Sequence, residues 1–271
     1  MASPSMKTSF ETPLVSVIVP FYNSEDTLES CIEALLAQRD VGGFYEILLV
    51  DNRSTDRSAE IASRYQVQNS ADGTRLTVLH ESEAGAYAAR NKGLRHASAP
   101  LIAFTDSDCD VDPRWLRAIR QGMEDPGVAI LLGHCRYPGE ASLPLRFLAA
   151  YENAKTQYVL EKKPSTYHFG YTNNMAVRAS VFDQIGPFKL WKRAADTELI
   201  HRLAANISDL KQPEQRVAFQ PAMKIIHREF LTARDRARRL SLYTSTNSKI
   251  ETFRELGAGG RLGVLLRFLG A

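Results

Sequence analysis

The sequence predicts an α/β protein in which a mixed, mainly parallel sheet is flanked by helices on both faces. Apolar, strand-like runs alternate with amphipathic helical patterns through the first half of the chain. The runs are almost continuously apolar, which is typical of parallel strands covered on both faces. With 271 residues, 44% of them hydrophobic, the chain is long enough to bury a full core.

Four strands and three helices are expected in strict alternation over the first half of the chain. In order, they are a strand at residues 14–20, a helix that starts at Ser24, a strand at 46–51, a helix at 58–65, a strand at 76–80, a helix at 87–96 and a strand at 101–106. Ligands bind sheets of this kind at the carboxyl ends of the strands. Polar side chains follow each strand here, so we expect the functional site at that edge.

The second half of the chain is less regular but continues the same mixture. It predicts a strand at residues 128–137, a helix at 143–160, a strand at 173–178 and a helix at 196–205. No internal repeat or low-complexity linker divides the chain, so we expect one domain over residues 1–228. A basic and helical extension is expected over residues 229–271.

The charge balance argues against a nucleic-acid-binding protein. The chain carries 34 basic and 31 acidic residues, a formal net charge of +3, whereas such proteins are usually strongly basic. Three scattered cysteines, Cys31, Cys109 and Cys135, fit buried thiols in a reducing compartment better than a disulfide framework. The N-terminal residues lack the apolar core of a signal peptide, and no run reaches the roughly 20 apolar residues of a membrane-spanning helix. We therefore expect a cytoplasmic protein.

Four aspartates stand at every second position of the segment FTDSDCDVDP, directly after the fourth strand. They are Asp106, Asp108, Asp110 and Asp112. An extended chain would place all four carboxylates on one face, where they would repel one another unless a positive group lay beside them. A calcium-binding EF-hand is excluded, because its loop needs glycine and glutamate where this chain has Val111 and Arg117.

Three interpretations of these aspartates stay open. A phosphatase with an aspartyl nucleophile would usually carry threonine or valine where this chain has Asp110. Asp112 alone can be explained as the cap of a helix that starts at Pro113. For Asp106 and Asp108 we favour a divalent cation, Mg²⁺ or Mn²⁺, held against the diphosphate of a nucleotide, because oxygen ligands suit both ions.

Four ordered motifs carry a resemblance to a known family. They are VSVIVPFYNSEDTLESCIEALLAQ, ILLVDNRSTDRS, EAGAYAARNKGL and IAFTDSDCDVDPRWL. In this order and spacing the chain resembles inverting glycosyltransferase family 2, over roughly residues 14–205. The resemblance implies the Rossmann-like GT-A fold, a nucleoside-diphosphate sugar as donor, a divalent metal and a single displacement at the anomeric carbon. It also implies a donor half over about residues 14–112 and an acceptor half over about 113–228.

The resemblance assigns donor binding to residues at the exits of the strands. The matching positions are Pro20, Phe21, Tyr22 and Asn23 after the first strand, Asp51 after the second, Gly85 and Arg90 in the third motif and Asp106 after the fourth strand. The first four would hold the nucleobase and ribose, and Asp51 would accept a hydrogen bond from the base. Gly85 would allow close approach of the substrate, and Arg90 would meet phosphate. Asp106 would touch the ribose or, through water, the metal.

Simpler explanations compete for some of these residues. The exit of the first strand can be a plain turn before a helix, and Arg90 can be a solvated surface charge. Ser54 and Thr55 are expected to cap the helix that follows the second strand. Asn91 is expected to set the conformation of its loop.

The expected metal ligands are Asp108, Asp106 and a late histidine, His227. The family often takes its third ligand from an apolar strand that precedes a basic helix, and His227 lies in such a setting in KIIHREF. Neutral imidazole is a competent ligand for these ions. A lone histidine is as often a structural hydrogen-bonding residue, so both interpretations stand.

The resemblance places the catalytic base at the start of a late helix. There the family often carries a Glu-Asp pair, and the corresponding residues here are Ala195 and Asp196. Asp196 is the expected base, although the first acid is missing and an N-cap role would also explain it. Glu198 is the reserve candidate. The residues expected to line the acceptor site are Gly170, Asn173 and Asn174.

These residues together predict an enzyme that moves a sugar from a nucleoside-diphosphate donor, expected to be UDP-linked, to a hydroxyl acceptor with inversion. The chain lacks a QxxRW-type motif, which favours addition of single sugars to a carbohydrate or lipid-linked acceptor over processive synthesis. Two alternatives stay open. One is a catalytically silent relative that binds nucleotide sugars. The other is a nucleotidyltransferase, which would normally show a glycine-rich phosphate loop where this chain has FYNSED.

The C-terminal extension combines a basic run with an apolar tail. The run RDRARRL contains Arg234, Arg236, Arg238 and Arg239, and the chain ends in LGVLLRFLGA. A solvated basic face would explain the run. Attraction to an anionic membrane surface, with the tail at the interface, is the more specific hypothesis. No nucleic-acid partner is expected.

Overall fold

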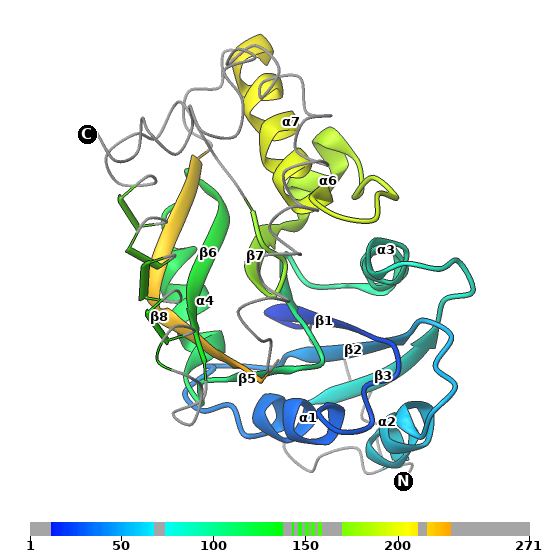
Figure 1. Cartoon of the computed structure of the whole chain (residues 1–271). Helices are drawn as coiled ribbons and strands as arrows, with labels where there is room; N and C mark the ends of the chain where they lie inside the picture. Colours follow the sequence, from blue (N-terminus) through cyan, green and yellow to red (C-terminus); the bar gives the residue numbers. More distant parts are fainter. Residues whose placement is uncertain are drawn as a thin grey trace, which may run out of the picture.

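A mixed sheet forms the centre of the protein (Figure 1), as seen in a computed structural model. The structure describes residues 12–67, 74–137, 170–210 and 216–228, together with some positions between 143 and 158. Within these residues the sheet has eight strands in the order β3-β2-β1-β4-β7-β6-β8-β5. The predicted fold class, a mixed sheet flanked by helices in a Rossmann-like arrangement, is confirmed.

The observed elements follow the predicted order closely. The strands are β1 Val15–Phe21, β2 Glu46–Asp51, β3 Arg75–His80, β4 Leu101–Thr105, β5 Cys109–Val111, β6 Val128–Arg136, β7 Asn174–Arg178 and β8 Arg216–His227. The helices are α1 Leu28–Leu36, α2 Ser58–Val67, α3 Ala86–His96, α4 Trp115–Gly122, α6 Ala179–Ile185 and α7 Ala195–Leu210. The described positions between 143 and 158 are helical, as predicted for that segment. The extension over residues 229–271, including its four arginines, lies outside the described residues.

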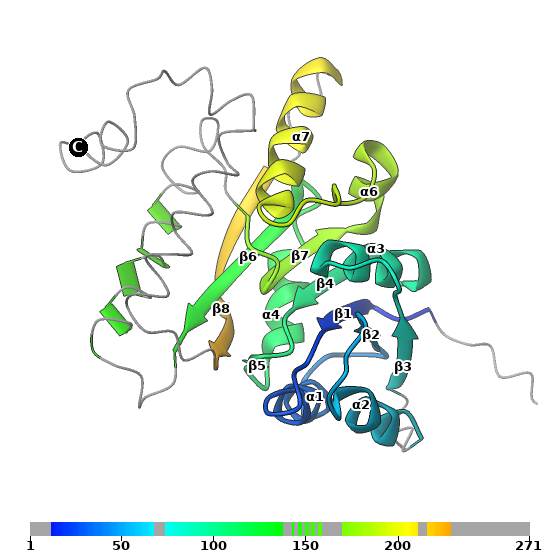
Figure 2. The same ribbon diagram turned by 45° about the vertical axis from the view of Figure 1, so that its right-hand side comes forward.

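Hydrophobic side chains alternate between the two faces of the sheet. In β1, Val17 and Val19 join a core cluster with α1, α2 and α4, whereas Ile18 joins the cluster that contains α3, α6 and α7. Figure 2 shows these two groups of helices on opposite sides of the strands. This arrangement explains why the strands are apolar at nearly every position, since both faces are buried.

Four parallel strands bring their carboxyl ends to one edge of the sheet. β1 pairs in parallel with β2 and β4, and β2 pairs in parallel with β3. The register places Phe21 beside Asp51, and Asp51 beside His80. The loops that follow these strands therefore emerge together, as the sequence predicted.

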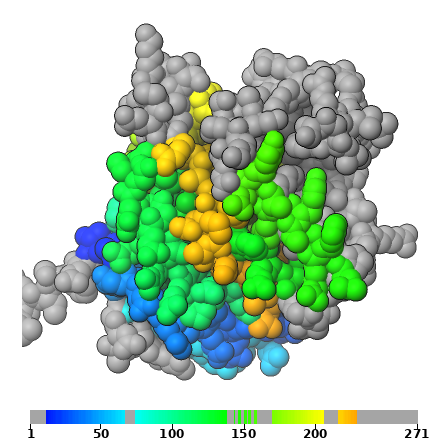
Figure 3. Space-filling model, turned by 90° about the vertical axis from the view of Figure 1, so that its left-hand side faces the viewer, coloured from blue at the N-terminus to red at the C-terminus, as the bar shows by residue number. Residues whose placement is uncertain are grey.

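The later strands reverse direction and return to that edge. β7 runs antiparallel to both β4 and β6, and β8 runs parallel to β6. The register of the β6–β8 pair shifts between Gly133 and His134, after which the end of β8 pairs antiparallel with β5. Cys109 is then opposite His227. On the face drawn in Figure 3, β8 lies between the surface formed by α4 and β6 and the described residues of the 143–158 segment.

Two predicted helix starts differ from the structure by two residues or more. α1 begins at Leu28 rather than Ser24, because the Ser24 carbonyl first accepts the N–H groups of Thr27 and Leu28 in a separate turn. α4 begins at Trp115 rather than Pro113, and the Asp112 carboxylate accepts the N–H of Arg114 in the turn before it, at 2.9 Å.

The predicted caps of α2 are wrong. The carboxylate at the start of this helix belongs to Asp56, whose Oδ1 accepts the Ser58 N–H at 3.0 Å. Ser54 and Thr55 instead bind Asn23, one through its side-chain oxygen and the other through its backbone N–H. These two residues join the loops after β1 and β2 rather than a helix terminus.

No helix within the described ranges is both long and apolar enough to cross a membrane.

Replacing Gly133 with alanine should destabilise the protein by about 1–3 kcal/mol. A Cβ atom at this position would lie 2.3 Å from the Nδ2 atom of Asn174 and 2.3 Å from the carbonyl oxygen of Met223, so neighbouring strands would have to move. Chemical denaturation would measure the change in the free energy of unfolding. Gly43→Ala is the matched control, because its Cβ would meet the flexible side chain of Leu14. Equal stabilities of the two variants would contradict the expected clash.

Candidate active site

Hydrogen bonds join the loops at the carboxyl edge of the sheet. The Asn23 N–H donates to Ser54 Oγ at 3.2 Å, and Asn23 Oδ1 accepts the Thr55 N–H at 2.8 Å. The hydroxyls of Ser24 and Ser107 are 2.8 Å apart, which links the loop after β1 to the turn after β4. The loops therefore support one another before any ligand binds.

Asn52 fixes the loop that precedes α3. Its Nδ2 donates to the carbonyl oxygens of Glu81 and Glu83 at 3.1 and 2.6 Å, and its Oδ1 accepts the Gly85 N–H at 2.7 Å. Gly85 has a φ of 128°, which strongly favours glycine, and a Cβ there would meet no described atom within 4 Å. The predicted tight turn is confirmed, and open space lies beside it.

The predicted base-binding residues separate into buried and exposed ones. Pro20 and Phe21 are buried, and Phe21 packs in the core with α1, so its side chain is not available to a nucleotide. Tyr22 is 59% exposed, and Asn23 is exposed with a φ of 47°. The Asp51 carboxylate is buried, accepts the Ser54 N–H at 3.0 Å and lies 2.8 Å from His80 Nδ1.

Arg90 is buried rather than solvated. Only 4% of the residue is exposed, and its guanidinium forms an ion pair with Asp106 and lies over the Tyr87 ring, 5.2 Å from the centroid. Its Nε is buried with no hydrogen-bond partner among the described residues. The alternative of a surface charge is therefore wrong, and the positive group expected beside the aspartates is present.

The four aspartates do not share one face. A turn follows Asp106, whose carbonyl accepts the Cys109 N–H, and only Cys109–Val111 is extended. Asp106 then faces Arg90 of α3, whereas Asp110 accepts a hydrogen bond from Ser30 of α1 on the opposite side of the sheet and pairs with Arg228. The structure thereby separates like charges that an extended chain would have placed together.

Asp108 and His227 lie together at the β5–β8 junction. Asp108 Oδ2 is 3.8 Å from His227 Nε2, and these two residues with Cys109 offer ligand atoms that all lie within 4.8 Å of one another. Burial, together with the charges of Asp108 and Asp106, raises the pKa of the Cys109 thiol well above its ordinary value. The thiol is thus neutral, and the carboxylate and imidazole are the donors suited to Mn²⁺ or Mg²⁺. This donor set fits the predicted metal.

Asp106 stands outside that group of three residues. Its carboxylate is paired with Arg90, and its side chain is 32% exposed. Asp106 is therefore not positioned to contact the predicted metal directly.

Asp196 lies buried in the first turn of α7. Its carboxylate accepts the N–H groups of Thr197 at 2.8 Å and Thr172 at 3.2 Å, and the Tyr87 hydroxyl also bonds to it. Burial raises the pKa of this carboxyl above its ordinary value, although these hydrogen bonds and the charge of Arg90 act in the opposite direction. Since α7 already begins at Ala195, Asp196 is not simply its N-cap.

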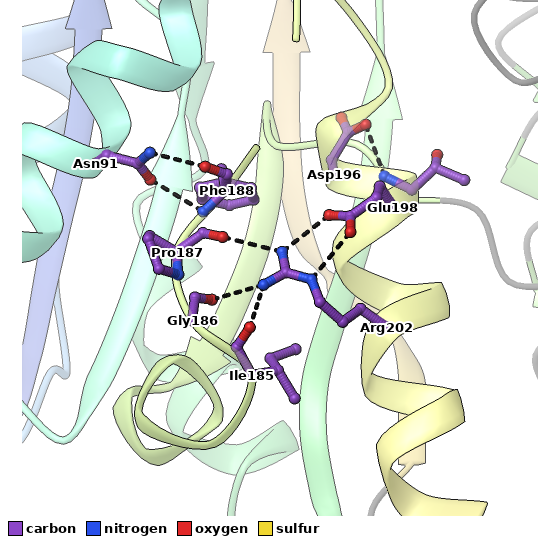
Figure 4. Close-up of polar contacts among 9 residues, drawn as sticks. Asn91, Ile185, Gly186, Pro187, Phe188, Asp196, Glu198 and Arg202 are labelled. Carbon is purple, nitrogen blue, oxygen red and sulfur yellow. Dashed lines mark hydrogen bonds and ion pairs between the residues drawn. The ribbon is translucent and has the colours of Figure 1, made fainter. Parts of the chain in front are cut away.

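Glu198, the reserve candidate, is occupied by an ion pair. Its two carboxylate oxygens accept hydrogen bonds from Arg202 at 3.0 and 2.8 Å, as Figure 4 shows. A carboxylate held on both oxygens is poorly placed to take a proton from a substrate. The geometry therefore favours Asp196 as the base.

The predicted acceptor residues have different environments. A Cβ at Gly170 would lie 2.8 Å from the carbonyl oxygen of Asp196, so this glycine allows close packing against the start of α7. Asn173 is half-buried, and its Oδ1 has no hydrogen-bond partner among the described residues.

The expectation that Asn174 lines the acceptor site is wrong. This residue is fully buried, its Oδ1 accepts from Trp115 Nε1 at 2.8 Å, and its Nδ2 donates to the carbonyl oxygens of His134 and Met223. Its whole amide thus connects β6, β7, β8 and α4.

Two residues near Asp196 were missed in the sequence. Tyr87 bonds to the Asp196 carboxylate, and Arg202 holds Glu198. The four-residue spacing between Glu198 and Arg202 is a recognisable helical ion-pair signal. For Tyr87 no local signal exists, because its partner is more than a hundred residues away.

Comparisons with known proteins agree with this geometry. Residues 16–196 match the model of the family described as glycosyl transferase family 2. The chain is 30% identical to glycosyltransferase AglE of Haloferax volcanii over 178 residues, which cover 65% of this chain and 56% of that relative. The chain thus spans little more than half of that relative's length.

Two solved structures share the fold. One is mannosyltransferase PcManGT from Pyrobaculum calidifontis in complex with GDP-Man and Mn²⁺, with a TM-score of 0.61 and 21% identity over 88% of this chain and 65% of that one. The other is glucosyl-3-phosphoglycerate synthase from Mycobacterium tuberculosis in complex with Mn²⁺, UDP-Glc and phosphoglyceric acid, with a TM-score of 0.54 and 18% identity over 88% and 79%. At these identities the likeness concerns the fold.

Thiol labelling should separate the three cysteines by burial. Cys31 and Cys109 are 0% exposed, and burial raises the pKa of both thiols, whereas Cys135 is only half-buried. We expect a thiol-reactive disulfide reagent at pH 8 to modify Cys135 in the folded protein and all three residues in guanidinium chloride. The folded Cys135→Ser variant should not react with the reagent. Rapid modification of the folded variant would contradict the burial of Cys31 and Cys109.

Proposed function

The chain belongs to glycosyl transferase family 2, and we propose that it moves a sugar from a nucleoside-diphosphate donor to a hydroxyl acceptor with inversion at the anomeric carbon. The observation that carries the proposal is the meeting of two unlike groups at one edge of the sheet. Asp108 and His227 offer ligands for a divalent cation, and Asp196 offers a buried carboxylate of raised pKa. Arg90 lies near both groups, because it pairs with Asp106, two residues before Asp108, and its charge acts on Asp196.

The donor is proposed to bind over the loops after β1, β2 and β3. Tyr22 and Asn23 are exposed there, and the buried Asp51 carboxylate is available to a base N–H if His80 moves aside. We propose a UDP-linked sugar as donor. One of the two related structures contains UDP-Glc and the other GDP-Man, so the fold is compatible with both nucleotides.

Asp108 and His227 would hold Mn²⁺ or Mg²⁺, with Asp106 reaching it through water. When bound, such an ion stabilises the negative charge that gathers on a departing diphosphate. Arg90 adds a positive charge on the α3 side, and its Nε has no hydrogen-bond partner among the described residues. A buried guanidinium is a strong partner for phosphate oxygens, because it needs no reorganisation as charge develops.

Asp196 is proposed to take the acceptor proton. The acceptor oxygen forms a bond to the anomeric carbon, the bond from that carbon to the diphosphate breaks, and the proton passes to the Asp196 carboxylate. Its raised pKa makes it a better base than an exposed aspartate, since its affinity for the proton is greater. The hydrogen bonds from Thr172 and Thr197 keep it oriented while leaving each oxygen further acceptor capacity.

The acceptor is proposed to be a carbohydrate or lipid-linked hydroxyl, glycosylated once per encounter. Contact between residues 229–271 and an anionic membrane stays a prediction from the sequence. Family membership sets the nucleotidyltransferase alternative aside. A silent protein that binds nucleotide sugars without turnover is the remaining competitor, and the missing acid at Ala195 is the feature that favours it.

A donor panel tests the proposal directly. UDP-glucose, UDP-N-acetylglucosamine and GDP-mannose would each be incubated with the protein and MnCl₂, and release of the nucleoside diphosphate would be followed. We expect turnover of at least one donor, and a fall of about 100-fold or more with EDTA or in Asp108→Ala, since several kcal/mol of charge stabilisation would be lost. Asp112→Asn is the control, because this carboxylate only caps a turn. Binding without turnover would support the silent protein, and turnover that survives both changes would refute the metal site.

Asp196 should also govern the pH dependence of the reaction. A general base must be ionised, so the rate falls as pH drops through its pKa, and a raised pKa moves this loss above the pH expected for an exposed aspartate, whose pKa is about 3.9. Asp196→Asn should lower kcat by about 10²–10⁴-fold. Donor binding measured over the same pH range would separate a loss of proton transfer from a loss of donor binding. An unchanged kcat at pH 4, or in Asp196→Asn, would assign the base elsewhere.

A further inference from the structure

The segment Ile185–Phe188 begins at the last residue of α6. It lies between α7, the helix of the proposed base, and α3, the helix that carries Arg90. Figure 4 shows it enclosed by side chains from α7 on one side and from α3 on the other. Both helices contribute polar groups that bond to its backbone. These contacts have no part in the roles assigned above.

From α7, Arg202 binds three successive carbonyl groups of this segment. Its guanidinium donates to the carbonyl oxygens of Ile185, Gly186 and Pro187, the last two at 3.2 and 2.9 Å. The same guanidinium holds both oxygens of Glu198, one turn earlier in the helix. The Arg202 side chain is 21% exposed; its bonds to Ile185 and Gly186 are partly buried, and its bond to Pro187 is exposed.

From α3, Asn91 binds the next residue of the segment. Its Nδ2 donates to the Phe188 carbonyl oxygen at 2.9 Å, and its Oδ1 accepts the Phe188 N–H at 3.0 Å, both in buried surroundings. The predicted role of Asn91 in setting a loop thus has a concrete form. The loop is the distant segment after α6.

The Phe188 ring continues the connection toward the site. Its centroid lies 5.6 Å from that of Tyr87 and 5.3 Å from that of Phe104. The Tyr87 hydroxyl bonds to Asp196, and Arg90 lies over the Tyr87 ring. A closed chain of contacts therefore runs from α7 through Ile185–Phe188 to α3 and back to the proposed base.

We propose that Arg202 is a positioning residue that holds α7, and with it Asp196, at a set distance from α3 through the segment Ile185–Phe188. The inference rests on the proposed function for its catalytic consequence. Asp196 stands six residues before Arg202 on the same helix, and Arg90 stands next to Asn91 on α3. The bonds of Arg202 and Asn91 to Ile185–Phe188, here called the clamp, thus connect the helix of Asp196, the proposed base, with the helix of Arg90, the proposed partner of the diphosphate. Misplacement of reacting groups by about 1 Å can lower a rate by about 100-fold.

Arg178 provides a matched control for this proposal. It also donates to three backbone carbonyl groups, those of Val128, Met123 and Asp125, at 2.7–2.9 Å. It pairs with Leu101 at the start of β4, the end of the strand opposite Asp106. Arg178→Lys therefore removes a comparable set of bonds at the other edge of the sheet.

The first readout is steady-state kinetics with the donor that the panel identifies. Lysine keeps the charge but lacks the planar fork that bonds several carbonyls at once. We expect Arg202→Lys to lower kcat by about 10-fold or more while the KM for the donor changes less than about threefold. Arg178→Lys should leave kcat near the wild-type value even where it lowers stability by a similar amount. Equal losses of kcat in the two variants would reduce Arg202 to a merely structural residue and overturn the proposal.

The second readout does not depend on activity. The Thr172 N–H donates to Asp196 Oδ2, so its hydrogen exchange reports where the carboxylate lies. We expect exchange at Thr172 and Phe188 to accelerate at least about tenfold in Arg202→Lys and to stay unchanged in Arg178→Lys. Unchanged exchange at both amides in Arg202→Lys would overturn the clamp. If the wild type turned over no donor, the proposed function would fail. Hydrogen exchange at these two amides would still test whether Arg202 holds α7 in place.

Discussion

The antiparallel pairing of β5 with the end of β8 is the constraint on which the site depends. It sets Cys109 opposite His227, and thereby brings an imidazole from the end of the described chain to Asp108, more than a hundred residues earlier. After the register shift beside Gly133, β8 stays paired with β6 up to Ile226 and pairs with β5 on its other side. Such a shift places extra residues on one strand and bends it.

Charge separation organises the rest of this edge. An uninterrupted strand would have held four carboxylates together, but the turn after Asp106 sends them to different partners. Arg90 neutralises Asp106, and Arg228 neutralises Asp110, so Asp108 is the carboxylate left facing His227. Like charges that would repel one another are thereby given separate partners.

The surroundings of Asp196 depend on burial more than on charge neutralisation. Asp196 lies in a shielded position where two backbone N–H groups and a tyrosine hydroxyl hold it, and where burial strengthens its hold on a proton. Burial also explains why alanine rather than an acid is suited to position 195. A second carboxylate beside this one would be buried as well, since Ala195 is 0% exposed, and it would need its own compensation. Arg202 and Glu198 already compensate each other one turn further along.

The sequence by itself determined the order of strands and helices and the edge at which the polar residues gather, because apolar periodicity and strand-end polarity are local properties. It also located Asp108, His227 and Asp196 through motifs. Only the tertiary structure decided that Phe21 and Asn174 face the interior, that Arg90 is buried against Asp106, and that Ser54 and Thr55 serve Asn23 instead of a helix. Those outcomes depend on partners that lie tens of residues away, and long-range pairing leaves no trace in a local pattern.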